Sequence, residues 1–325
     1  MKKHILVTGG AGYIGSHMSR LLLDEGYSVV VFDNLSTGYK RLVAPEAVFV
    51  KGDLCRDNEI EKVFTRYKVE AVMHFCASIQ VGESVKNPIK YYENNIGSAI
   101  ALLKAMFRHR VKKIIFSSTA AVYGDPVSVP IGEDAALKPV NPYGKTKLTI
   151  EELLADIAAA DPAFEYSALR YFNACGAHPN GRLGEMHNPE THLIPNILKA
   201  IKDKKEFTQF GNDYPTPDGT CIRDYIHVMD LCRAHLLALK AFDTGVKNEA
   251  FNLGSGSGYS ISEVVSAAEA VTGKKVKIKL CPRRAGDPPR LVASSAKAKK
   301  VLGWQPRHGL TDILETAWAW GTKQG

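Results

Sequence analysis

The chain has 325 residues, of which 45% are apolar and 23% charged, a composition typical of a globular protein with one large domain or two modest ones. It contains no run of about 18 uncharged apolar residues, and it passes directly from Met1–Lys3 into a strand-like segment. We therefore expect neither a signal peptide nor a membrane span, and a cytoplasmic location.

The charged residues and the cysteines exclude several other classes of protein. The formal net charge is +8, but neither aromatic stacking residues nor a recognition motif accompany the basic residues, so we expect no nucleic-acid partner. An anionic small-molecule substrate fits this charge. The six cysteines form no Cys-x-x-Cys pair, which favours reduced thiols over disulfides or zinc, and we predict no metal site.

Apolar strand-like segments alternate with helix-like segments through the first half of the chain. We expect strands at residues 4–8, 28–33, 47–53, 70–75, 112–118 and 164–173. We expect helices at residues 13–25, about 57–67, about 91–109 and from about 143. This alternation predicts an α/β fold with a doubly wound parallel sheet, covered by helices on both faces and joined by right-handed crossovers.

From about Ala174 the alternation loosens into a segment rich in Pro, Gly, His and Asn, and we place a boundary between two lobes there. We predict a first domain over residues 1–174 and a smaller mixed α/β lobe over residues 175–325, with about 221–255 returning to the first domain. Further along, Ser260 and Glu263 favour a capping box at the start of a helix over a phosphate-binding loop.

A glycine loop joins the first predicted strand to the first predicted helix. Gly9, Gly12 and Gly15 recur at three-residue intervals, which lets the turn bend and brings backbone N–H groups close to a pyrophosphate. The next strand ends in Asp33, whose carboxylate can accept hydrogen bonds from an adenosine ribose and would repel a 2′-phosphate. These features predict NAD rather than NADP. Asp53 after the third strand fits either an adenine contact or an ordinary strand end.

Tyr143 and Lys147 are four residues apart, so on a helix both side chains lie on one face. A free tyrosine has a pKa of about 10. A neighbouring ammonium group and a cationic nicotinamide ring both favour the phenolate, which makes Tyr143 a candidate general base. The hydroxyl-rich strand end Ser117–Thr119 precedes this pair.

These motifs together resemble the extended short-chain dehydrogenase/reductase family. The segments "TGGAGYIGS", "DN" at 33–34, "GDL" at 52–54, "FSSTAAVYG" and "YGKTK" occur in that family's order. The later segments "RYFNACGAHP", "FGNDYPTPDGTCIRDYIHVMDL" and "RRAGDPPRL" are similar to the branch that epimerises nucleotide sugars at C4. The resemblance covers about residues 4–320 and implies a Rossmann-type NAD-binding domain beside a UDP-sugar-binding lobe.

By the same resemblance, Tyr13 and Ile14 contact the pyrophosphate, Asp53 and Leu54 frame adenine, and Lys147 holds the nicotinamide ribose. Related epimerases can carry a lysine at the position of Ile79, so this chain departs from them there. The implied cofactor-binding residues are Gly9, Gly12, Tyr13, Ile14, Gly15, Asp33, Asn34, Leu35, Ser36, Thr37, Gly38, Asp53, Leu54, Phe75, Cys76, Ala77, Ser78, Ile79, Asn94, Thr119, Tyr143, Lys147 and Phe172.

The resemblance also implies the reaction, an interconversion of UDP-glucose and UDP-galactose through a transient 4-keto sugar. Tyr143 removes the proton of the sugar 4-hydroxyl, Thr119 aligns that hydroxyl, and arginines from two segments grip the UDP pyrophosphate. The implied substrate-binding residues are Thr119, Tyr143, Asn173, His192, Leu193, Thr208, Gln209, Phe210, Arg223, Arg284, Asp287 and Leu291.

Several alternatives stay open at this point. A 4,6-dehydratase is disfavoured, because Ala120 and Ala121 stand where that enzyme has an acidic pair. A reductase, a UDP-pentose or UDP-uronate 4-epimerase, and a non-catalytic NAD-binding regulatory protein remain alternatives. Leu291 falls where some epimerases have a bulky tyrosine, so UDP-N-acetylhexosamines are further candidate substrates. The helices from about Tyr91 and from Tyr143 are expected to pair in a homodimer, as is common in the family.

Overall fold

The computed structural model of the protein describes residues 3–283 and 288–324. The predicted substrate residues Arg284 and Asp287 lie outside the described residues. Within the two described ranges, no helix combines the length and the apolar composition that a membrane crossing requires.

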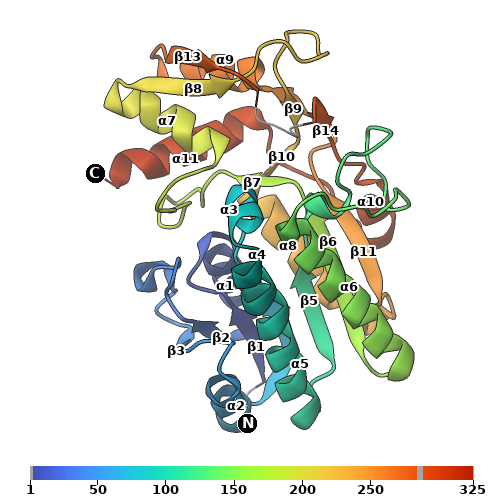
Figure 1. The fold of residues 1–325 in the computed structure, drawn as a ribbon. Helices are drawn as coiled ribbons and strands as arrows, with labels where there is room; N and C mark the ends of the chain where they lie inside the picture. The colour runs from blue at the N-terminus through green and yellow to red at the C-terminus, as the bar shows by residue number, and fades with distance from the viewer. Residues whose placement is uncertain (1–2, 284–287, 325) are drawn as a thin grey trace.

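The core of the first lobe is a parallel sheet of seven strands in the order β11-β6-β5-β4-β1-β2-β3 (Figure 1). All six pairings between neighbouring strands in this sheet are parallel. This sheet confirms the predicted doubly wound α/β fold. Its strands are β1 (His4–Thr8), β2 (Ser28–Asp33), β3 (Val48–Lys51), β4 (Val69–His74), β5 (Lys113–Ser117), β6 (Glu165–Tyr171) and β11 (Glu249–Leu253).

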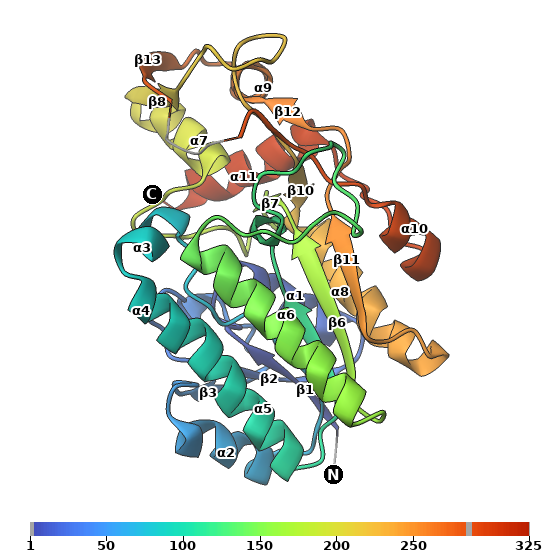
Figure 2. The same ribbon diagram turned by 45° about the vertical axis from the view of Figure 1, so that its right-hand side comes forward.

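Helices cover both faces of this sheet because successive strand residues point to opposite sides. On one face, Ile5 and Val7 pack with the buried residues of α1 (Tyr13–Asp24) and α8 (Val228–Ala241). On the other face, Leu6 packs with α2 (Asp57–Arg66), α5 (Ser98–Arg108) and α6 (Pro142–Ala160), and Figure 2 shows α5 and α6 side by side. The near-continuous apolar strands are therefore buried on both faces of the sheet, as is typical of parallel sheets.

The second lobe lies at the carboxyl ends of the strands, above the sheet in Figure 2. Its core joins α7 (Leu193–Asp203), α9 (Ile261–Thr272) and α11 (Leu310–Lys323). A two-stranded parallel sheet, β8 (Glu206–Phe210) with β13 (Lys277–Cys281), extends this lobe. Smaller sheets link it to the first lobe: β7 (Asn173–Cys175) with β10 (Tyr225–His227), and β12 (Tyr259–Ser260), β9 (Ile222–Arg223) and β14 (Arg290–Leu291).

Shorter elements complete the described chain. They are the helices α3 (Val81–Lys86), α4 (Pro88–Tyr91) and α10 (Ala296–Leu302), a π-helical segment (Tyr92–Gly97) and the 3₁₀ turns Lys40–Leu42, Ala120–Val122 and Phe242–Thr244. Ser260 closes the predicted capping box, because its hydroxyl accepts the Glu263 N–H at 3.0 Å and its own N–H donates to the Glu263 carboxylate at 2.7 Å.

Some element boundaries differ from the prediction. The expected helix over about 91–109 already begins at Pro88, whose fixed φ suits a first helical position, and it passes through the π-helical segment before α5. The strand expected at 164–173 ends at Tyr171, and Asn173 starts β7 with a new partner. β11 lies beside β6 in the seven-stranded sheet. The division of the chain at residue 174 stays a prediction.

Four buried histidines make the stability of this fold sensitive to acid. Burial lowers the pKa of His17 and His235 to about 4 and that of His74 and His227 to about 3. A group with a lowered pKa in the folded state stabilises the fold above its unfolded value of about 6.5, and this contribution is lost as the pH falls toward the folded value.

We predict that the free energy of unfolding, measured with urea, falls between pH 6.5 and pH 4 by up to about 1.4 kcal/mol per pH unit for each such histidine. His235, which is 0% exposed on α8, offers a clean test. A His235→Leu variant should show a shallower pH dependence than the wild type, because one buried imidazole no longer has to be protonated. An unchanged slope would contradict this account.

Candidate active site

The glycine loop at the end of β1 leaves no room for a side chain at Gly9 or Gly15. Gly9 has a φ of 73°, and a Cβ there would lie 2.8 Å from the Cys76 nitrogen. A Cβ on Gly15 would lie 2.3 Å from the Gly9 oxygen. The following helix α1 begins after Gly12, and no side chain caps it. The N–H groups of its first turn and the positive end of its dipole are therefore oriented for an anion.

Asp33 lies at the end of β2 beside this loop. Its two carboxylate oxygens accept the N–H of Ala11 at 3.0 Å and of Leu35 at 2.8 Å. Burial raises the pKa of Asp33, and these two N–H donors oppose the shift. Gly38 lies so close to Ala11 that a Cβ would be 2.8 Å from the Ala11 carbonyl carbon. Residues 33–38, all predicted to bind the cofactor, thus fold back onto the glycine loop.

The remaining predicted cofactor residues lie at the ends of β3 and β4 and on the π-helical segment. Asp53 accepts the Asn34 side-chain N–H at 3.2 Å, whereas Leu54 is only 2% exposed and packs in the core. Residues 75–79 follow β4, with Ile79 42% exposed. Asn94 donates its side-chain N–H to the Asn95 side chain at 3.1 Å. Phe172, between β6 and β7, is buried in a cluster with Val122 and Ala293.

Asn95 is a site-building residue that the sequence analysis did not identify. Its side-chain oxygen accepts the Ser78 N–H at 2.8 Å, and its nitrogen donates to the Ser78 carbonyl at 3.1 Å and to the Thr146 hydroxyl at 3.0 Å. One amide thus ties the 75–79 segment to α6. The π-helical turn is the available signal, since such bulges are frequent at functional sites.

Helix α6 begins with a side-chain cap and a close contact. Asn141 caps it by accepting the Gly144 N–H at 2.9 Å, and Pro142 occupies its first turn. A Cβ at Gly144 would lie 2.6 Å from the Ala121 carbonyl oxygen. Glycine at this position therefore lets the start of α6 approach the turn that follows β5, and the same approach brings Tyr143 to Thr119.

Tyr143, Thr119 and Lys147 form a buried polar group at this contact. Burial raises the pKa of Tyr143, and a hydrogen bond with the Thr119 side chain opposes the shift. The Lys147 ammonium donates to the Ser117 carbonyl at 2.8 Å, and burial lowers the pKa of Lys147 to about 8. The spacing of Tyr143 and Lys147 predicts that the ammonium favours the phenolate, but without a cofactor the effect of burial on the Tyr143 pKa is larger.

Glu151 and Arg170 form a buried ion pair next to this group, and the sequence motifs did not predict it. Glu151 is one further turn along α6 from Lys147, and its carboxylate accepts the Arg170 Nε–H at 3.0 Å and the Ser118 hydroxyl. Arg170 also donates to the Tyr123 hydroxyl at 2.9 Å. The regular spacing Tyr143, Lys147, Glu151 is the sequence signal that points to it.

Apart from Thr119 and Tyr143, the described substrate residues come from five separate segments. Asn173 donates its side-chain N–H to the Asp224 carbonyl at 2.7 Å, which places it next to β9. Arg223 and Leu291 are register partners in β9 and β14. His192 and Leu193 stand at the start of α7, and Thr208, Gln209 and Phe210 lie on β8, which pairs with β13 rather than with β9.

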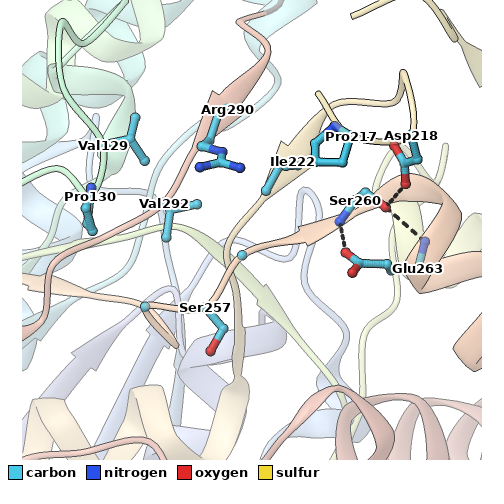
Figure 3. Close-up of a pocket in the computed structure, with 12 residues that line it drawn as sticks. Val129, Pro130, Pro217, Asp218, Ile222, Ser257, Ser260, Glu263, Arg290 and Val292 are labelled. Carbon is cyan, nitrogen blue, oxygen red and sulfur yellow. Dashed lines mark hydrogen bonds between the residues drawn. The ribbon is translucent and has the colours of Figure 1, made fainter. Parts of the chain in front are cut away.

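A separate pocket lies between β9, β14 and the start of α9 (Figure 3). Its lining includes Ile222, Arg290 and Asp218, and none of the predicted catalytic residues. Because successive strand residues point to opposite sides, Arg223 and Leu291 face away from the side on which Ile222 and Arg290 line this pocket. This pocket is therefore not part of the candidate active site.

Comparisons with known proteins agree with this arrangement. The curated UDP-glucose 4-epimerase of Lactobacillus helveticus is 51% identical over 318 residues, covering 97% of this chain and 96% of the relative. The solved structure of UDP-glucose 4-epimerase from Brucella ovis in complex with NAD is 48% identical, with 99% of each chain covered and a TM-score of 0.94. The structure of UDP-glucose 4-epimerase from Bifidobacterium longum in complex with NAD+ and UDP is 40% identical, with 99% of this chain and 98% of that chain covered and a TM-score of 0.94.

A model of the NAD dependent epimerase/dehydratase family matches residues 5–254. This match confirms the family that the motifs predicted. The chain therefore belongs to the NAD-dependent epimerase/dehydratase family.

Proposed function

We propose that this protein inverts C4 of UDP-hexoses, interconverting UDP-glucose and UDP-galactose with tightly held NAD. The observation that carries the proposal is the buried group of Tyr143, Thr119 and Lys147 at the end of β5, across from the glycine loop. Near-full-length similarity to enzymes named UDP-glucose 4-epimerase supports the choice of substrate.

The residues present fit NAD. The uncapped start of α1 suits a pyrophosphate, and the Asp33 carboxylate, held by two backbone N–H groups, suits a ribose diol without a 2′-phosphate. Asn34–Gly38 with Asp53 would enclose the adenosine, with Leu54 packed in the core behind them, while residues 75–79, Asn94, Lys147 and Phe172 would hold the nicotinamide end. Bound there, NAD would supply reversible hydride transfer at C4 of the sugar, with the hydride returned to the opposite face of the 4-keto sugar.

Tyr143 would hold and move the proton in this reaction. Its ionised phenol oxygen would take the proton of the 4-hydroxyl, and the neighbouring Thr119 hydroxyl would orient that hydroxyl. Since burial raises the pKa of Tyr143, the phenolate needs positive charge beside it. Lys147, held by the Ser117 carbonyl, would contribute one such charge, and an oxidised nicotinamide ring bound in this site would contribute the other.

The UDP group would be held while the sugar turns between its two orientations. Arg223, Asn173 and Leu291 lie together on the segments that link the lobes, and Arg284 and Asp287 follow from the family resemblance alone. An arginine provides charge-assisted, forked hydrogen bonds to phosphate oxygens. A hold on UDP that leaves the sugar free to turn is what separates epimerisation from simple oxidation.

The alternatives make different chemical demands. A dehydratase needs an acid and a base after Thr119, but Ala120 and Ala121 form a 3₁₀ turn there and cannot transfer protons. A reductase would consume NADH stoichiometrically, and a regulatory protein would convert no substrate. We also propose that Leu291 leaves room for an N-acetyl group, so that UDP-N-acetylglucosamine is epimerised as well.

We further propose a homodimer in the cytoplasm. Ile89, Tyr92 and Ile100 follow one stripe along α4, the π-helical segment and α5, and they are 69%, 41% and 39% exposed. Monomeric proteins rarely leave such a stripe open to water. A second copy of the same stripe would cover it in a helix bundle formed with α6.

A Tyr143→Phe variant tests the proton transfer. Conversion of UDP-galactose to UDP-glucose, followed by NMR without added NAD, should fall at least about 100-fold, because general acid–base catalysis contributes factors of this size. A Tyr27→Phe variant, on the α1–β2 turn, is the matched control and should keep wild-type activity. Full activity of Tyr143→Phe would refute the assignment, and no wild-type conversion would refute the epimerase proposal.

Gly144→Ala tests the close approach of α6 to the turn after β5. The added methyl group meets the Ala121 oxygen, so Tyr143 should shift from Thr119, and kcat should fall about 10- to 100-fold while the protein stays folded. Gly321→Ala in α11, whose Cβ meets nothing within 4 Å, is the control and should be neutral. Wild-type kcat in a folded Gly144→Ala variant would show that this contact does not position Tyr143.

The dimer proposal is tested by light scattering on a sizing column. The wild type should have about twice the chain mass of 35.6 kDa, and an Ile89→Glu/Ile100→Glu variant should shift to the single-chain mass, since two carboxylates cannot be buried unpaired. Val127→Glu, at a loop residue that is 106% exposed, should leave the mass unchanged. A wild type of single-chain mass would overturn the proposal.

A further inference from the structure

Four side chains between β7 and α7 form a compact cluster apart from Tyr143. Glu185, His187, Glu190 and His192 each offer one donor atom, and these four atoms all lie within 4.8 Å of one another. We propose that this cluster is a structural metal site that binds one divalent transition-metal ion, with zinc as the fitting ion. The cysteine spacing predicts no metal site, but the proposed site contains no cysteine and follows the spacing Glu-x-His-x-x-Glu-x-His.

The donor atoms point at one another in a way that suits a shared ion. The Nδ1 atoms of His187 and His192 lie 3.1 Å and 2.5 Å from the same Glu185 oxygen, Oε1. The Glu190 oxygens lie 3.8 Å from His187 Nδ1 and 3.6 Å from His192 Nδ1. Zinc binds nitrogen and carboxylate oxygen at about 2.0–2.2 Å, so tetrahedral donors are about 3.3–3.5 Å apart. The observed separations lie on both sides of that value, and shifts of about an ångström would complete the site.

The surrounding structure holds the two carboxylates in place. The Glu185 side chain is 6% exposed, and its backbone oxygen accepts the Trp320 indole N–H at 3.0 Å. The Glu190 carboxylate is 12% exposed and accepts the N–H groups of Thr191 and His192 at 2.8 Å each. Buried and anchored carboxylates keep a cation site formed before the ion arrives, which lowers the entropy that binding costs.

The donor set identifies the class of ion. Two imidazole nitrogens with two carboxylate oxygens suit zinc, whereas Mg²⁺ and Ca²⁺ prefer oxygen donors throughout. Four protein donors also close the coordination sphere, which is typical of a structural site, since a catalytic zinc keeps a position open for water or substrate. The proposed ion therefore takes no part in the C4 chemistry.

The position of the cluster indicates what a bound ion would stabilise. The hydroxyl of Tyr13, in the first turn of α1, donates to the Gly176 carbonyl at 2.6 Å, at the start of the segment that carries the cluster. The same segment ends at His192, the residue before α7. Zinc would fix this crossing between the glycine loop and the second lobe. His192 would bind through Nδ1, and its Nε2, on the opposite side of the ring, stays available for the predicted substrate contact.

Metal content and cobalt spectroscopy on the full-length protein test the proposal. Protein treated with EDTA, desalted and dialysed against Zn²⁺ should retain about one zinc per chain. Co²⁺ in place of Zn²⁺ should give the intense visible absorption of a tetrahedral site. Glu185→Gln and His192→Asn should each weaken Co²⁺ binding at least tenfold, and circular dichroism will verify that both are folded. Because the His192 side chain is 43% exposed, that variant is suited to keeping its fold.

His178→Asn is the matched control. His178 lies in the same segment as the cluster but outside it, and its ring stacks on His17 of α1. It should bind Co²⁺ like the wild type. A wild type that retains no zinc and gives no tetrahedral Co²⁺ spectrum would overturn the proposal and leave an ordinary hydrogen-bonded network of two glutamates and two histidines. Equal Co²⁺ binding by the wild type and the two ligand variants would also overturn it.

Discussion

The site depends on one contact, the approach of the first turn of α6 to the turn that follows β5. Gly144 permits it, because any Cβ there would lie 2.6 Å from the Ala121 oxygen. The Asn141 cap fixes where the helix begins, and Tyr143 consequently meets the Thr119 side chain. Beneath this contact, the ion pair between Glu151 and Arg170 ties α6 to β6 and to the Ser118 hydroxyl. The reacting group is thus placed by rigid elements on three sides.

Burial gives this site its chemical character. It raises the pKa of Tyr143, lowers that of Lys147 to about 8 and keeps His74 neutral by lowering its pKa to about 3. The protein alone therefore holds the phenol in its protonated form. A positive charge brought in beside the phenol would be little screened in such surroundings, so its effect on the Tyr143 proton would be large. On this account, the cofactor both takes part in the oxidation and prepares the base.

Local pattern was enough to predict the parallel sheet, the glycine loop, Asp33 and the Tyr143–Lys147 pair, because each follows from spacing along one strand or helix. The π-helical turn with Asn95, the Glu151–Arg170 pair and the close fit of Gly144 join residues that are distant in sequence. Helical spacing places Glu151 on the same face as Lys147, but it does not reveal which distant residues these groups contact. The late start of the predicted helix at Tyr91 has a local origin. Pro88 opens that helix, but the apolar pattern on which the prediction rested becomes regular only further along.

The central claim is that the positive charge of the oxidised cofactor lowers the pKa of Tyr143, and a titration of Tyr143 tests it most directly. Ultraviolet difference titration of wild type against Tyr143→Phe isolates the Tyr143 phenolate, once with NAD+ bound and once with NADH bound. The account predicts a pKa well below the free value of 10.0 with NAD+, where the ring is cationic, and above it with NADH, where the ring is neutral. The same Tyr143 pKa in both forms would contradict the account.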